Sequence, residues 1–84
     1  MFNIEFVKSA GKEYLALPKI VQSRIEKGID ALRFDPHPVG SKKLQGHTHL
    51  FRVRVSDYRI VYSLDETAQL VTVTRIRHRK DVYQ

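Results

Sequence analysis

The 84-residue chain contains no cysteine and has only nine acidic residues against fifteen lysines and arginines. Without cysteine it can form neither a disulfide nor a metal site built from thiolates. No apolar run approaches the roughly 18 residues that span a membrane. The start, Met1-Phe2-Asn3-Ile4-Glu5, also lacks the basic residues and long apolar stretch of a secretion signal. We therefore expect a cytoplasmic protein with no membrane partner.

The length predicts one domain, residues 1–84, because a chain this short cannot build two cores. Its 42% hydrophobic and 29% charged residues are typical of a folded protein and argue against disorder. We expect a thin core between one layer of helices and one sheet.

The positive charge is concentrated in the second half of the chain. Residues 1–41 hold six basic and five acidic residues, a net charge of +1, whereas residues 42–84 hold nine and four, a net charge of +5. Such an asymmetry is typical of nucleic-acid binders, although an anionic membrane or an acidic protein would also fit it.

The stretch from Phe51 to Tyr62 predicts two strands joined by a two-residue turn at Ser56-Asp57, because apolar and basic residues alternate on both sides of it. This register places three arginines on one face and apolar residues on the other. The arginines are Arg52, Arg54 and Arg59. They could form a solvated outer face or a prepared anion site, and the pattern fits both.

Further elements follow from periodicity and turn residues. We expect a first strand over residues 2–7, a short helix over 10–17 capped by Ser9, and an amphipathic helix that starts at Pro18. A polar loop over residues 35–49 should contain no regular structure. A last strand over residues 70–76 is predicted, but its alternation leaves open which face is buried.

Three loop histidines, His37, His47 and His49, raise the possibility of a metal site. The loop has no cysteine and one acid, Asp35, and a His-x-His segment is a weak match to any metal motif. We therefore predict no metal and no cofactor.

The last eight residues, 77–84, form a basic tail that contains one tyrosine. Such a tail suits RNA cleavage without a metal. Arginine binds phosphate oxygens with its planar fork and stabilises a phosphorane, but its pKa above about 12 makes it a poor proton carrier. His78 and Tyr83 are the nearby candidates for proton transfer, and Tyr83 could instead stack on a base. Each could equally be a structural residue, His78 on the surface and Tyr83 at the end of the core.

Three segments, Leu50–Arg54, Asp57–Tyr62 and Arg77–Tyr83, resemble those of the RelE/ParE superfamily of bacterial and archaeal toxins. The order of elements and a Lys-Leu-x-Gly segment at residues 43–46 extend the resemblance over nearly the whole chain. It implies an α+β, two-layer fold, with a helical hairpin packed on a twisted, mainly antiparallel four-stranded sheet in the order β-α-α-β-β-β.

The resemblance also implies a ribosome-dependent endoribonuclease that cuts translated mRNA in the A site and is neutralised by a cognate RelB-like antitoxin. Arg59 would hold the scissile phosphate, Arg77 would stabilise the transition state and Tyr83 would stack on or deprotonate the substrate. If the tail register differs by two residues, Arg79 takes the role of Arg77. The other residues expected at the RNA are Arg52 and Arg54, where the family has lysines, with Lys42, Lys43, His78, Arg79 and Lys80.

Two other functions remain open. A ParE-like member of the same superfamily would inhibit DNA gyrase without nuclease chemistry, because one fold hosts both activities. A degenerate member would only bind RNA or an antitoxin.

Overall fold

The computed structural model describes residues 1–46 and 49–81. One mixed sheet carries all the strands, in the order β1-β5-β4-β3-β2, with β1 parallel to β5 and the other neighbours antiparallel. The elements in chain order are β1 (Asn3–Phe6), α1 (Lys8–Leu15), α2 (Lys19–Ala31), β2 (Lys42–Lys43), β3 (Leu50–Val55), β4 (Tyr58–Asp65), β5 (Leu70–His78) and the 3₁₀ helix η1 (Arg79–Asp81).

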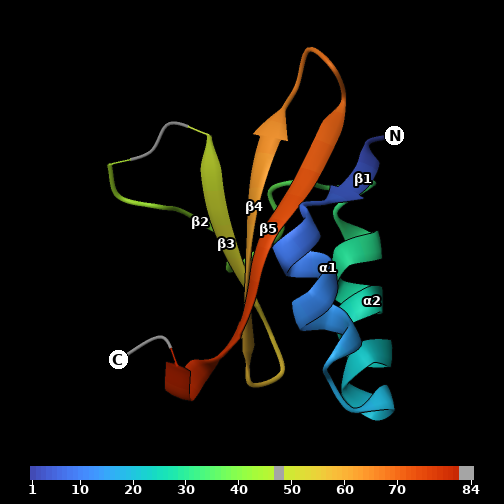
Figure 1. Ribbon diagram of the computed structural model, residues 1–84. Helices are drawn as coiled ribbons and strands as arrows, with labels where there is room; N and C mark the ends of the chain where they lie inside the picture. Colours follow the sequence, from blue (N-terminus) through green and yellow to red (C-terminus); the bar gives the residue numbers. More distant parts are fainter. Residues whose placement is uncertain (47–48, 82–84) are drawn as a thin grey trace.

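Both helices lie on the same side of the sheet, next to β1 and β5 (Figure 1). Buried side chains from the helices, from the C-cap residue of α2 and from the central strands meet between these two layers. They are Ala10 of α1, Ile25 and Ile29 of α2 and the C-cap Leu32, with Ile60, Tyr62, Leu64, Val71, Val73 and Ile76. The α+β, two-layer fold expected from the sequence is therefore confirmed.

The central hairpin has the predicted register. Val55 pairs with Tyr58, Arg54 with Arg59, and Arg52 with Val61. Because paired residues point to the same side of a sheet, the arginines share the face away from the helices. Ile60 and Tyr62 take the opposite, buried face.

A β-bulge resolves the ambiguous alternation of β5. The pairing between β4 and β5 shifts between Val61 and Tyr62, so that Tyr62 pairs with Val73 whereas Val61 pairs with Arg75. The extra residue in β5 is Thr74, whose hydroxyl donates to the Val61 carbonyl at 3.2 Å. A bulge resets the alternation by one residue, and this allows Val73 and Ile76 to be buried on the same face.

Tyr62 ties the chain after α2 to the sheet. It is fully buried, and its hydroxyl donates to the Pro36 carbonyl at 2.7 Å. Burial raises the pKa of the Tyr62 hydroxyl, which therefore keeps the proton that this hydrogen bond needs.

Three expectations about local structure were wrong. The sheet has five strands instead of four, because Lys42 and Lys43, expected in an irregular loop, pair with Arg52 and Phe51. The first helix runs from Lys8 to Leu15 instead of over residues 10–17. Its N-cap is Val7 and not Ser9, and no side chain caps it, since the chain enters the helix directly from β1.

Over the described residues, no helix is long and apolar enough to cross a membrane.

The two helical glycines occupy opposite environments. Gly28 in α2 faces β3 so closely that a Cβ atom there would lie 2.5 Å from Cγ2 of Val55, whereas a Cβ atom at Gly11 in α1 would meet nothing within 4 Å. Gly28 therefore sets the approach of α2 to the sheet.

The same substitution at these two glycines should change stability in opposite directions. Gly11→Ala should stabilise the fold by roughly 0.5–1 kcal/mol, because alanine loses less backbone entropy in a helix. Gly28→Ala should destabilise it by about 1–3 kcal/mol through overpacking against Val55. Urea unfolding followed by circular dichroism measures both values.

The control is the double variant Gly28→Ala/Val55→Ala, in which the clashing atoms are absent. The overpacking cost of the alanine at position 28 should be largely lost in the Val55→Ala background. An equal cost in both backgrounds would show that Gly28 is not needed for the approach of the helix.

Candidate functional site

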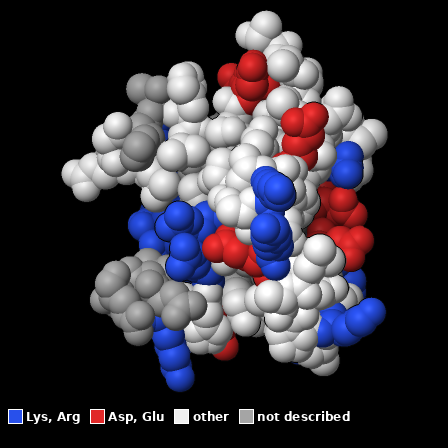
Figure 2. Space-filling model, viewed as in Figure 1, with Lys and Arg blue, Asp and Glu red and all other residues white. Residues whose placement is uncertain are grey.

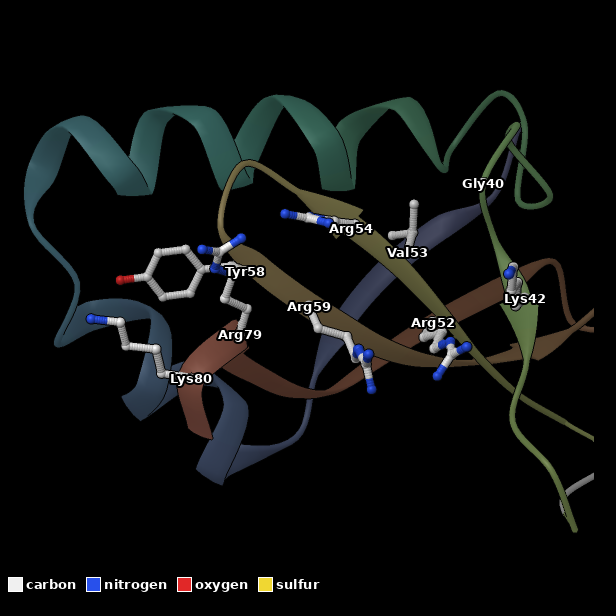
Figure 3. Close-up of a pocket in the computed structure, with 9 residues that line it drawn as sticks. All are labelled: Gly40, Lys42, Arg52, Val53, Arg54, Tyr58, Arg59, Arg79 and Lys80. Atoms are coloured by element: carbon white, nitrogen blue, oxygen red, sulfur yellow. The ribbon is translucent and has the colours of Figure 1, made fainter. Parts of the chain in front are cut away.

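A groove of about 410 Å³ is lined by six basic side chains on the sheet and the tail. Arg52 and Arg59 are half-buried, whereas the other four are exposed. In Figure 3, the guanidinium groups of Arg52 and Arg59 project to the same side of the sheet. The six are Lys42, Arg52, Arg54, Arg59, Arg79 and Lys80, and Gly40, Val53 and Tyr58 complete the lining.

Strand pairing brings the first four cations together. Arg54 lies opposite Arg59 across β3 and β4, and Lys42 lies opposite Arg52 across β2 and β3. The short strand β2 therefore adds a lysine to the arginine face of the hairpin. Nε of Arg54 also donates to the Ser56 carbonyl at 3.2 Å, which holds this side chain near the turn.

The tail contributes the other two cations because η1 is fastened to the hairpin turn. The backbone N–H of Arg79 donates to the Asp57 carbonyl at 2.8 Å. The N–H of Lys80 donates to Nδ1 of His78 at 3.1 Å, and the His78 ring meets the Tyr58 ring edge-on with centroids 5.1 Å apart. These contacts hold Arg79 and Lys80 at the groove that Arg59 also lines.

The groove is an electropositive surface without an acidic lining residue among the side chains of residues 1–46 and 49–80. Among the side chains of residues 1–46 and 49–80, the ion pairs are Arg33 with Asp30, His37 with Glu66 and Arg77 with Glu13, and none includes a groove cation. Figure 2 shows Lys and Arg side chains gathered on the side of the sheet away from the helices. Clustered like charges disfavour folding, and an anion with several phosphates would relieve this repulsion.

Three residues predicted at the RNA do not line the groove. Arg77 lies opposite Arg59 in the sheet, but its Nε is 3.2 Å from Oε2 of Glu13 in α1. Lys43 lines a separate hollow with His37, His49 and Phe51. His78 packs against Tyr58 and supports the tail instead of facing the groove.

Arg79, and not Arg77, is the tail arginine that lines the groove together with Arg59. This arrangement corresponds to the alternative tail register considered from the sequence. The predicted site residue Tyr83 lies outside the described residues, as does His47. The described part of the chain contains no group of three or more histidine, aspartate or glutamate side chains placed to hold a metal.

Tyr58 is the groove residue that the sequence analysis missed. The alternation assigned it to the apolar face, where its ring packs on the core cluster, but it also lines the end of the groove beside Lys80 (Figure 3). Its position directly after the turn, within reach of both faces, is the signal that could have suggested this.

A family of toxins matches this chain over residues 4–83, under the description ParE toxin of type II toxin-antitoxin system, parDE. The chain therefore belongs to this family, within the RelE/ParE superfamily, and it is RelE-like. Toxin RelG of Mycobacterium tuberculosis is 26% identical to it over 84 residues, covering 99% of this chain and 97% of the relative. Putative toxin RelE1 of Methanocaldococcus jannaschii is 26% identical over 86 residues, covering 99% and 96%.

Solved structures share the fold. The archaeal RelE-RelB complex from Pyrococcus horikoshii OT3 includes a chain that is 26% identical, with a TM-score of 0.82 and coverage of 93% of this chain and 94% of that one. The isolated E. coli RelE toxin is 24% identical, with a TM-score of 0.83 and coverage of 99% and 92%, and supports the fold alone.

Removal of one groove cation should weaken salt-dependent binding of a single-stranded oligonucleotide. Each phosphate contact on a single strand contributes about 0.7 to the slope of log K against log salt concentration. Arg59→Gln should lower this slope by about that amount. Fluorescence anisotropy of a labelled oligodeoxynucleotide between low and physiological salt measures it.

Arg24→Gln is the matched control, because Arg24 is an exposed arginine on α2, in the helical layer. It removes the same charge and should leave the slope unchanged. Equal effects of the two substitutions would mean that net charge, and not the groove, binds the oligonucleotide.

Proposed function

We propose that this chain is the toxin of a type II toxin-antitoxin pair that cleaves translated mRNA in the ribosomal A site without a metal. The observation that carries the proposal is the groove of six cations with no acidic lining residue among the side chains of residues 1–46 and 49–80. The groove extends across three β-strands and the tail, which suits binding of several consecutive phosphates of single-stranded RNA. The toxin would act in the cytoplasm, where mRNA is translated.

The proposed cleavage is an attack of a ribose 2′-hydroxyl on the adjacent phosphorus. The 2′-oxygen–phosphorus bond forms, the bond from phosphorus to the 5′-oxygen breaks, and a proton passes from the 2′-hydroxyl to a base while another reaches the leaving 5′-oxygen. The phosphorane between these steps carries extra negative charge. Arg59 and Arg52, half-buried in the middle of the groove, would stabilise it, and Arg79 would act from the tail.

Proton transfer needs groups other than these arginines, because they stay charged at neutral pH. The sequence offers Tyr83 and His78 for this task, and the family resemblance implies that Tyr83 either stacks on the substrate or helps to deprotonate it. Tyr58 is a second hydroxyl-bearing candidate, since it lines the groove beside Lys80.

The partner we propose is a RelB-like antitoxin, because the Pyrococcus structure similar to this chain is a complex of RelE with RelB. An acidic or amphipathic segment laid along the groove would neutralise its cations and exclude RNA from the same surface.

A second candidate function is inhibition of DNA gyrase, which is favoured by the match to a family described as ParE toxins. The six-cation groove favours the ribonuclease instead, because inhibition by protein binding does not require a surface prepared for phosphates.

Primer extension on a defined mRNA in a purified translation reaction tests the ribonuclease proposal. We expect new 5′ ends within A-site codons that depend on ribosomes. Arg59→Ala should lower the cleavage rate by roughly 10²–10³-fold, the usual effect of removing a group that stabilises the transition state. The control variant Arg24→Gln, with its substitution on α2 in the helical layer, should cleave mRNA at the wild-type rate.

Circular dichroism of Arg59→Ala must show a folded protein, since Arg59 faces away from the core. Intact mRNA with folded wild-type toxin would contradict the proposal. A gyrase supercoiling assay on the same preparation would then distinguish a gyrase inhibitor from a degenerate binding module.

A further inference from the structure

The edge of β5 near Ile76 is covered by a side chain instead of a strand. β1 pairs with β5 only from Leu70 to Val73, and beyond that point no strand among residues 1–46 and 49–81 neighbours this edge. There the backbone N–H of Ile76 donates to Oε1 of Glu13 at 2.9 Å. One carboxylate of α1 therefore satisfies an N–H that β1 does not reach.

The second oxygen of the same carboxylate contacts an arginine. Oε2 of Glu13 lies 3.2 Å from Nε of Arg77, and the two side chains are 27% and 42% exposed. The Nε–H is not aligned for a hydrogen bond, so this contact is an ion pair. Glu13 thus binds the backbone at one residue of β5 and the side chain of the next.

Without this contact, Arg77 would be expected in the groove. It lies directly opposite Arg59, and paired residues point to the same side of the sheet. Arg59 lines the groove, but Arg77 does not. The carboxylate at the sheet edge is the feature that distinguishes the surroundings of these two arginines.

We propose that Glu13 is a positioning residue that holds Arg77 at the edge of β5 and withholds its charge from a single-stranded nucleic acid in the groove. This inference rests on the proposed function, since it concerns the ligand of the same groove. A partly exposed ion pair of this kind changes an equilibrium constant by about fivefold, so the expected effect is a modest gain in affinity when Glu13 loses its charge.

The test compares wild type, Glu13→Gln, Arg77→Gln and the double variant in binding a labelled oligodeoxynucleotide, which lacks the 2′-hydroxyl and is not cleaved. Glutamine keeps an oxygen that can accept from Ile76 N–H but has no charge to hold Arg77. Glu13→Gln should bind roughly threefold more tightly at low salt, as one more cation reaches the phosphates. Arg77→Gln should change little in the wild type and should abolish the gain in the Glu13→Gln background.

Glu66→Gln is the control for net charge, because it removes an exposed carboxylate at the turn between β4 and β5. Its gain in affinity should be less than half that of Glu13→Gln. Weaker binding by Glu13→Gln, or a gain that persists without Arg77, would overturn the proposal.

An NMR measurement without any nucleic acid separates this inference from the proposed function. The Nε–H proton of Arg77 should exchange with water more slowly in the wild type than in Glu13→Gln, because the ion pair shields it. Equal exchange rates would overturn the restraint by Glu13. A wild type that binds no oligonucleotide would instead contradict the groove as a binding surface for nucleic acid, on which the proposed function relies, and the exchange rates would still decide whether Glu13 restrains Arg77.

Discussion

The pairing of β4 with strands on both of its sides is the constraint on which the structure depends. Ile60, Tyr62 and Leu64 point to the helices, while Arg59 between its two arginine partners points away from them. A slip of one residue in either ladder would exchange these faces and bury guanidinium groups. The hydrophobic effect on one face therefore fixes the position of every strand cation on the other.

The concentration of cations is difficult to explain by stability. Arg54 lies opposite Arg59, and Arg59 lies opposite Arg77, so three like charges follow one another across three strands. Directly opposed like charges destabilise a sheet. The fold relieves part of this repulsion through the ion pair of Arg77 with Glu13 and leaves Arg59 in the groove. Local conflicts with folding of this kind are expected where a surface serves binding.

The hairpin could be predicted from the sequence, but the contacts between distant segments could not. Alternation and a two-residue turn determine that Val53 and Ile60 pair, because both effects act within a few residues. The bulge at Thr74 depends on which face of β5 meets the core, and the helical layer packed on that strand decides this. The pairing of Lys42 with Arg52 and the contact of Glu13 with Arg77 join segments that no local pattern connects. For this reason the cationic face was predictable, but the exclusion of Arg77 from the groove was not.

The arginines of the groove divide the proposed chemistry between two kinds of side chain. Arg52 and Arg59 can bind phosphates and stabilise the phosphorane, but arginine is a poor general acid or base. Binding and electrostatic stabilisation would therefore reside in the groove, and proton transfer in hydroxyl groups such as that of Tyr58 at its end. Loss of an arginine would then weaken both RNA affinity and the cleavage rate. Loss of the hydroxyl that transfers the proton would reduce the rate while leaving the affinity unchanged, since that group contributes no charge to the groove.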